Sequence, residues 1–261
     1  MKEKNMPAEL VKIVYKAGLL IMDIYQENFD VNTKTDNSPV TIADKNAEEL
    51  ILNDLCNIFP DIPVVSEEAY SNGILPDFND KFFLVDPLDG TKEFIKKNGE
   101  FTVNIGLIKS ELSVMGVIYA PAKNIMYFSD EKNNAYELKI DKNFSGSLKN
   151  AKKINTNSYD IKNLIAVTSR SHNNKKTNEF LRDYNIQETL LLGSSYKFCL
   201  LACGKADIYP RLSPTCEWDI AAGHAILKAA GGNIYTLDGD ELRYGHKDNN
   251  FINPHFLARH Y

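Results

Sequence analysis

The chain has 261 residues, of which 43% are hydrophobic and 25% charged, and its formal net charge is −5 at pH 7. This composition is typical of a globular protein with a sizeable core, built as one large unit or as two closely packed halves. The negative charge, and the lack of interleaved basic and aromatic residues, argue against nucleic-acid binding. An acidic protein can still bind phosphate esters where metal ions or local basic residues reverse the field at the site.

The start of the chain and its cysteines indicate a cytoplasmic protein without a membrane span. Lys12 and Lys16 interrupt the first apolar stretch, and its longest unbroken run, 17–22, is too short to cross a bilayer or to act as a secretory signal. The cysteines form no C-x-x-C pair or zinc-type spacing, which predicts reduced thiols. They are Cys56, Cys199, Cys203 and Cys216.

The first half of the chain predicts an α+β arrangement. Apolar residues recur at helical spacing in 8–26 and in 42–58, and the polar stretch 34–39 between them predicts a loop that could close over a site. Six β-rich runs follow and predict strands, with a hairpin between the third and the fourth. These runs are 62–65, 82–85, 101–109, 113–119, 124–128 and 135–139.

The second half predicts alternating strands and helices, which is typical of an α/β arrangement. It follows a segment rich in Lys, Asn and Ser, 141–158, that predicts a surface connection. The predicted strands are 164–168, 190–192 and 206–209, and the predicted helices are 174–184, 195–203 and 219–230. We therefore divide the chain into an N-terminal α+β half, 1–155, and a C-terminal α/β half, 156–261, within one compact unit.

The motif DPLDGT carries the strongest chemical signal. An apolar run delivers Asp86 at the end of a predicted strand, and Asp89 follows three residues later. Pro87 stiffens the turn, and Gly90 lets the backbone approach a ligand closely. If Thr91 opens a short helix, backbone amides face outward as an anion site beside two carboxylates, a donor set that suits Mg²⁺. Taken alone, however, this motif is better explained as a turn after a buried strand.

Three further acidic motifs change that balance. Glu67 follows another apolar strand, Asp219 heads an apolar helix, and Asp44 lies in the first turn of a helix. Singly, Asp219 is explained as a helix cap and Asp44 as a carboxylate favoured by the helix dipole. Four acidic motifs, each at the end of an element, are hard to explain as independent caps.

Together the strings SPVTIAD, SEE, DPLDGT and EWDIAAGHA resemble the lithium-sensitive, magnesium-dependent phosphatase superfamily of inositol monophosphatase and fructose-1,6-bisphosphatase. The resemblance covers essentially the whole chain and implies a layered αβαβα sandwich. Longer segments, such as DIPVVSEE and GSSYKFCLLACGKADIYPRLSPT, are similar to its 3′(2′),5′-bisphosphate nucleotidase branch, CysQ type. That branch removes one phosphate from adenosine 3′,5′-bisphosphate, the by-product of sulfate activation.

One departure bears on the substrate. Inositol monophosphatases carry an acidic residue, which holds sugar hydroxyls, ahead of the helix Asp, and here that position is Leu212, beside Arg211. The replacement favours a second anionic group on the ligand over an inositol.

The resemblance implies that two or three Mg²⁺ activate a water nucleophile, with Asp44, Glu67 and Thr91 as the catalytic residues. Asp44 would orient Thr91, and Glu67 would serve as a second base. The implied ligands are Glu67, Asp86 and the carbonyl of Leu88 for a first Mg²⁺, and Asp86, Asp89 and Asp219 for a second.

The predicted substrate contacts fall into two groups. Around the reacting phosphate the resemblance implies Leu88, Asp89, Gly90, Thr91 and Asp219. Ser195, Lys197 and Arg211 are assigned to the second phosphate or the ribose, and His172 to the nucleotide, although each alone is explained equally well as a solvated surface residue. Trp218 is more consistent with core packing than with base stacking.

Several alternatives stay open at this point. An inositol monophosphatase, a fructose-bisphosphatase and a non-catalytic metal- or nucleotide-binding homologue are rival functions. Turnover of the sulfated nucleotide, lithium sensitivity, a homodimer, and peripheral contact with the cytoplasmic face of the inner membrane are further expectations that the residues do not decide.

Overall fold

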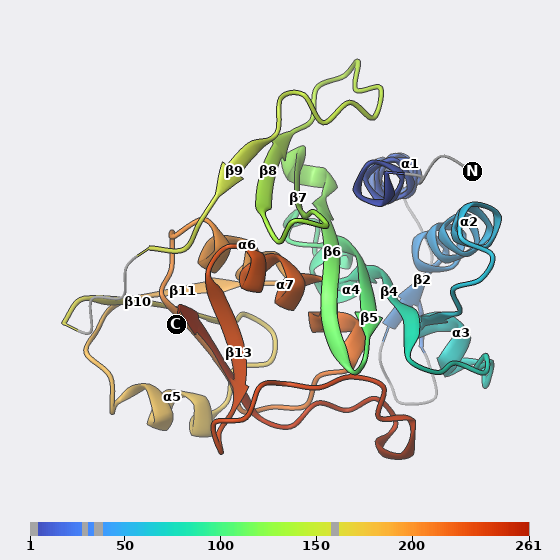
Figure 1. Ribbon diagram of the computed structural model, residues 1–261. Helices are drawn as coiled ribbons and strands as arrows, with labels where there is room; N and C mark the ends of the chain where they lie inside the picture. Colours follow the sequence, from blue (N-terminus) through green and yellow to red (C-terminus); the bar gives the residue numbers. More distant parts are fainter. Residues whose placement is uncertain (1–4, 28–30, 34–38, 158–161, 261) are drawn as a thin grey trace.

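The computed structural model describes residues 5–27, 31–33, 39–157 and 162–260 (Figure 1). The chain begins with helix α1 (Met6–Gln26), and an antiparallel pair of short strands, β1 (Val31–Thr33) and β2 (Pro39–Thr41), leads into helix α2 (Ile42–Ile58). Among the described residues no helix has both the length and the apolar character needed to cross a membrane.

The first large sheet has seven strands in the order β3-β4-β5-β6-β7-β8-β9. Only β3 and β4 pair in parallel, and the other neighbours are antiparallel. The strands are β3 (Val64–Ser66), β4 (Lys81–Asp89), β5 (Thr102–Lys109), β6 (Leu112–Ala120), β7 (Ile125–Ser129), β8 (Ala135–Lys139) and β9 (Lys152–Ile154). Two five-residue helices follow: α3 (Glu67–Ser71) comes directly after β3, and α4 (Thr91–Ile95) comes after β4 and Gly90.

The second sheet has five strands in the order β11-β10-β12-β14-β13. β10 pairs in parallel with β11 and β12, whereas β14 is antiparallel to both of its neighbours. The strands are β10 (Leu164–Ser169), β11 (Ile186–Leu192), β12 (Ile208–Arg211), β13 (Gly232–Thr236) and β14 (Phe256–His260). The helices of this half are α5 (Lys175–Leu181), α6 (Tyr196–Ala202) and α7 (Glu217–Ala229).

The elements stack in five layers, as the predicted αβαβα sandwich requires. In Figure 1, α1 and α2 cover one face of the seven-stranded sheet, and α6 and α7 lie between the two sheets. α5 packs on the outer side of the five-stranded sheet. Because α7 is covered on both sides, it is apolar nearly all round, which explains why small and aliphatic residues make up most of it after Asp219.

Two glycines let α7 lie unusually close to the seven-stranded sheet. A Cβ on Gly116 would lie 2.3 Å from the carbonyl oxygen of Ala222, and one on Gly106 would lie 2.8 Å from the Cβ of Ala221. Any larger side chain on β5 or β6 would therefore push α7 away from the sheet. This contact holds the start of α7, which carries Asp219, near the ends of the central strands.

Most predicted elements are present, with shifted ends. α2 has the predicted bounds, and α1 begins two residues early because the Asn5 side chain accepts a hydrogen bond from the Ala8 amide. β4 continues to Asp89, past the predicted end at residue 85, because a bulge allows it to keep pairing with β5 beyond Pro87.

Five strands were not predicted. β9 lies inside the segment 141–158 that predicted a surface connection, and its Lys-Lys-Ile sequence has no apolar alternation. β13 and β14 complete the second sheet, and β1 and β2 form a separate pair. Of the predicted loop 34–39, residues 34–38 lie outside the described residues, and Pro39 begins β2.

Candidate active site

Asp44 lies at the third position of α2 and is 1% exposed. Its Oδ2 accepts hydrogen bonds from the Thr41 amide and hydroxyl, both at 2.7 Å, which closes a capping box. Its Oδ1 accepts a hydrogen bond from the Thr91 hydroxyl at 3.0 Å. The cap therefore fixes one carboxylate oxygen and turns the other towards the predicted catalytic threonine.

The bulge in β4 separates the two aspartates of DPLDGT. Asp86 pairs with Asn104 and Asp89 with Thr102, so the two intervening residues are looped out between paired positions. Gly90 follows with φ +95°, a conformation that a residue with a Cβ rarely adopts, and a Cβ there would lie 3.0 Å from the Glu100 carbonyl oxygen. The chain thereby turns straight into α4, and Thr91 becomes its first residue, as the sequence predicted.

Three predicted metal ligands form one cluster. Glu67, Asp86 and Asp219 each offer a carboxylate oxygen, and these atoms all lie within 4.8 Å of one another. Burial raises the pKa of the Asp219 carboxyl well above its usual range, and the charges of Asp89 and Glu67 raise it further. The ionised cluster is therefore unfavourable by itself, and bound cations would relieve the repulsion.

Asp89 lies beside this cluster and is tied to the C-terminal half. Its Oδ2 accepts hydrogen bonds from the amide and the hydroxyl of Ser195, both at 2.6 Å. The same hydroxyl lies against the backbone oxygen of Asp219, and Asn104 Nδ2 donates to it at 3.0 Å. Burial raises the pKa of Asp89, while the positive charge of Lys197 lowers it. Ser195, predicted as a substrate contact, thus also positions two predicted ligands.

Asp219 belongs both to a capping box and to the acidic cluster. It lies at the third position of α7, where its Oδ2 accepts a hydrogen bond from the Cys216 amide at 2.9 Å. The explanation of Asp219 as the N-cap is therefore wrong in position: the helix begins two residues earlier than predicted, Cys216 is the N-cap, and Asp219 takes part in the capping box from the third helical position. Trp218 is 4% exposed and packs against Tyr70 and Phe251, so its predicted role in the core is confirmed.

Two further predicted site residues, Leu88 and Lys197, are buried. The Leu88 side chain is buried in the core, while its carbonyl accepts a hydrogen bond from the Thr91 hydroxyl at 3.3 Å. Lys197 is 4% exposed, donates to the Ser194 carbonyl and lies over the ring of Tyr209.

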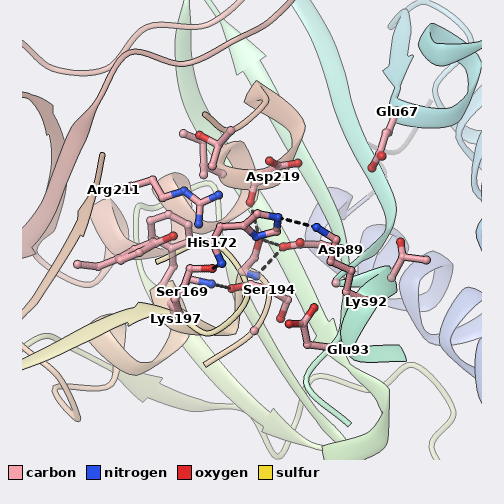
Figure 2. Close-up of a pocket in the computed structure, with 18 residues that line it drawn as sticks. Glu67, Asp89, Lys92, Glu93, Ser169, His172, Ser194, Lys197, Arg211 and Asp219 are labelled. Atoms are coloured by element: carbon pink, nitrogen blue, oxygen red, sulfur yellow. Dashed lines mark hydrogen bonds between the residues drawn. The ribbon is translucent and has the colours of Figure 1, made fainter. Parts of the chain in front are cut away.

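One pocket brings most of the predicted site residues together (Figure 2). Acidic groups of the cluster line one side, and Lys197 and Arg211 line the other. Arg211 is 7% exposed and is held by the carbonyls of Ser213 and Pro214 at 3.3 and 3.1 Å. Asp44, Asp86 and Leu88 are not among the lining residues, which fits their buried positions behind the pocket wall.

His172 stands at the junction of the two halves. Its backbone amide donates to the Ser169 hydroxyl at 3.1 Å, and its Nε2 lies 3.2 Å from the Lys92 ammonium (Figure 2). Desolvation lowers the pKa of His172 to about 4, and the positive charges of Arg211, Lys92 and Lys197 contribute to the shift. The imidazole is therefore neutral at pH 7.

Sequence reasoning missed several groups that shape the site. Glu48, one turn after Asp44, accepts hydrogen bonds from the Ser66 hydroxyl and the Ala69 amide, and so supports the backbone around Glu67. No local pattern marks Glu48 or Asn104, because their partners are distant in sequence. Lys92 and Glu93 directly follow the DPLDGT motif, and both line the pocket.

The two halves are also joined by ion-pair and hydrogen-bond contacts beside the pocket. Arg170 forms a bidentate pair with Glu100, with both N–O distances at 2.9 Å, and Glu100 accepts from the Gly193 amide at 2.8 Å. Glu93 accepts a hydrogen bond from the Ser171 hydroxyl. These contacts hold the loops that carry His172 and Ser195 against the half that carries Asp89.

The residues present fit magnesium as the group that the sequence implied. Every predicted ligand offers a hard oxygen donor, which is the chemistry that Mg²⁺ prefers. The cysteines form no disulfide, and none of them belongs to the acidic cluster.

Comparison with known proteins agrees with this geometry. A sequence model of the inositol monophosphatase family matches residues 3–258. The 3′(2′),5′-bisphosphate nucleotidase CysQ of Escherichia coli (strain K12) is 41% identical over 255 residues, which cover 97% of this chain and 99% of that protein.

Solved structures show the same relationship. The crystal structure of CysQ from Bacteroides thetaiotaomicron has a TM-score of 0.81 and 39% identity, and the match covers 99% of this chain and 98% of that one. An inositol monophosphatase of Thermotoga maritima shares the fold, with a TM-score of 0.77 at 24% identity over 95% of this chain and 89% of that one. The chain belongs to the inositol monophosphatase family.

Proposed function

We propose that this protein is a magnesium-dependent 3′(2′),5′-bisphosphate nucleotidase that hydrolyses adenosine 3′,5′-bisphosphate to AMP and phosphate. The observation that carries the proposal is a single pocket with an acidic cluster on one side and the buried cations Lys197 and Arg211 on the other. The acidic side suits a metal-bound reacting phosphate, and the basic side suits a second phosphate. The names of the relatives that cover nearly the whole chain support the same substrate.

Different residues of this chain would hold the metal ions and accept the proton of the attacking water. Glu67, Asp86, Asp89 and Asp219, with the carbonyl of Leu88, would hold two or three Mg²⁺. When bound, these ions neutralise phosphate charge and make water more acidic. The Thr91 hydroxyl donates a hydrogen bond to Asp44, so its oxygen can accept a hydrogen bond from the attacking water. As the water attacks, its proton passes to the Thr91 oxygen and the Thr91 hydroxyl proton passes to Asp44. Glu67 serves as a second base.

A substrate panel tests the proposal directly. We expect the wild-type enzyme to release phosphate from adenosine 3′,5′-bisphosphate with a higher kcat/KM than from inositol 1-phosphate or fructose 1,6-bisphosphate. The sulfated nucleotide belongs in the same panel, because a sulfate on the 5′ side would meet the same cations. A preference for inositol 1-phosphate would contradict the proposal, and no turnover of any substrate would favour a binding protein.

Activity should require a divalent cation, since every predicted ligand is a hard oxygen donor. We expect exhaustive chelation to abolish turnover and Mg²⁺ to restore it. Calcium should support binding with poor turnover, because its longer and looser coordination spoils the in-line geometry. Lithium should inhibit, as the family resemblance implies. Full turnover in metal-free buffer would disprove the assignment of the cluster.

Removing the Arg211 guanidinium should weaken binding of the bisphosphate more than of a monophosphate. We expect Arg211→Ala to raise the KM for adenosine 3′,5′-bisphosphate about tenfold to a hundredfold, the usual range for a charged hydrogen bond. Adenosine 3′-phosphate, which keeps the reacting ester and lacks the second phosphate, should be affected much less. The measurement is the ratio of the two KM changes.

Lys197→Ala is a less selective probe in the same experiment. Because the ammonium lowers the pKa of Asp89, its removal should also disturb the metal side and reduce turnover of both substrates. Equal losses for Arg211→Ala on the two substrates would mean that this residue supports the fold or the metal site, not the second phosphate.

We also propose that the division at residues 155 and 156 separates two cooperating halves. The seven-stranded sheet takes its strands from before this boundary and the five-stranded sheet from after it, with α7 packed against both. A homodimer, a cytoplasmic location and peripheral contact with the inner membrane stay predictions.

A further inference from the structure

Lys92 is a basic residue of the pocket that neither the motif nor the resemblance assigned. It is the second residue of α4, directly after Thr91, and its side chain is exposed at the pocket. Figure 2 shows the side chain extending from the N-terminal half towards His172 on the opposite wall.

The Lys92 ammonium lacks an acidic partner within the described part of the chain. Among residues 5–27, 31–33, 39–157 and 162–260, its hydrogen-bond partner is His172 Nε2, at 3.2 Å. The neighbouring Glu93 carboxylate is turned to the Ser171 hydroxyl instead. Since an ammonium can only donate, Nε2 accepts, and the imidazole proton lies on Nδ1. The contact is therefore with a neutral group and leaves the positive charge of Lys92 available to an anion in the pocket.

Three cations surround the same imidazole. Arg211, Lys92 and Lys197 all act electrostatically on His172, and all three line the pocket. Arg211 is anchored by two carbonyls, and Lys197 is buried beside Asp89, so both have partners that they keep without a ligand. Lys92 is the cation of this set that comes from the half carrying Asp86 and Asp89.

We propose that Lys92 is a specificity-determining residue that binds the non-reacting phosphate of the substrate from the side opposite Arg211. This inference rests on the proposed bisphosphate nucleotidase function. An anion placed beside His172 would be bound from both halves, by Lys92 on α4 and by Arg211 at the end of β12. The second phosphate would then hold the two halves together around the nucleotide.

The direction of the side chain separates this role from one on the reacting phosphate. Thr91 turns inward, to Asp44 and the Leu88 carbonyl, on the side of the acidic cluster. Lys92 reaches across to His172, which lies among the other cations of the pocket. Thr91 and Lys92, although adjacent in sequence, therefore face opposite sides of the pocket.

The test compares Lys92→Met with Lys96→Met, a matched change at the C-cap of the same helix. Lys96 is exposed at the end of α4 and does not line the pocket. We expect Lys92→Met to raise the KM for adenosine 3′,5′-bisphosphate about tenfold, and the KM for adenosine 3′-phosphate by less than about twofold. Lys92→Arg, which keeps the charge, should restore most of the affinity, and Lys96→Met should match the wild type.

Product inhibition provides a second readout that does not depend on turnover of the tested ligand. AMP keeps the non-reacting phosphate, whereas inorganic phosphate stands for the reacting one. We expect the inhibition constant of AMP to rise about tenfold in Lys92→Met and that of inorganic phosphate to stay within about twofold of the wild type.

The outcomes distinguish this inference from the proposed function. Equal losses with both substrates, or weaker inhibition by inorganic phosphate, would assign Lys92 to the reacting phosphate and overturn the inference. Identical behaviour of Lys92→Met and Lys96→Met would make Lys92 a solvated surface residue. A wild-type enzyme that prefers inositol 1-phosphate would defeat the proposed function itself.

Discussion

Asp89→Asn should reduce turnover by about a thousandfold or more while the protein stays folded. The amide nitrogen cannot ligate Mg²⁺, and losing several kcal/mol of charge stabilisation in the transition state has an effect of this size. The fold should persist because the Asn oxygen can still accept the hydrogen bond from the Ser195 amide. The measurement is kcat with saturating Mg²⁺, alongside a thermal unfolding curve of the same sample.

The same variant should be more stable than the wild type in metal-free buffer. Burial raises the pKa of both Asp89 and Asp219 in the folded protein, against the lowering effect of Lys197 on Asp89, and the charges of Asp89 and Glu67 raise that of Asp219 further. The unfolded chain therefore holds fewer protons than the folded one between the usual carboxyl pKa, about 4, and these raised values. Metal-free wild type should lose stability as the pH rises through that interval, and Asp89→Asn should lose less. Near-native turnover, or an unchanged response of the thermal midpoint to Mg²⁺, would show that Asp89 is not a ligand.

Asp44→Asn should lower kcat by about a hundredfold to ten-thousandfold, the usual contribution of a positioned general base. The Asn oxygen can keep the bond to the Thr41 amide, but its NH₂ group would then face the Thr91 hydroxyl. That group can only donate, so the Thr91 hydroxyl would keep only its longer contact with the Leu88 carbonyl, and the relay would lose its final base. KM should change little, because Asp44 is buried behind the pocket wall. The measurement is steady-state kinetics with adenosine 3′,5′-bisphosphate.

Thr91 variants provide the control for this relay. Thr91→Ala should resemble Asp44→Asn, Thr91→Ser should keep most activity, and the double variant should lose little more than either single one, because the two groups act as a unit. If Thr91→Ala were nearly as active as the wild type, water would have to reach Asp44 or Glu67 without the threonine.

Local patterns in the sequence determine much of this molecule. Periodic apolar residues locate α1 and α2, and the central strands of the first sheet follow from their apolar runs, because core burial imposes those patterns. The acidic motifs are also local, since each follows a strand or lies in the first turn of a helix. β9 was not predicted because it is an edge strand of mostly polar residues, and without a buried face its sequence has no alternation of apolar and polar residues.

Only the tertiary structure decides how the motifs work together. The register of β4 with β5 brings Asn104 beside Asp86, and the close approach of α7 at Gly106 and Gly116 places Asp219 with Glu67. The structure also shows that a place in a capping box and a place in the acidic cluster are compatible, because the Asp219 carboxylate accepts a hydrogen bond from the Cys216 amide and belongs to the cluster.

The roles of the pocket residues depend most on contacts between the halves. The sequence predicts Ser195 as a substrate contact, and packing places its hydroxyl between Asp89 and the backbone of Asp219. No local pattern in the sequence marks Lys92 for the role that we propose, since that role depends on its contact with His172, eighty residues further along the chain. Hydrogen-bond partners distant in sequence leave no periodic pattern, so the sequence determined which groups are candidates for the chemistry, and the folded structure decided what each one faces.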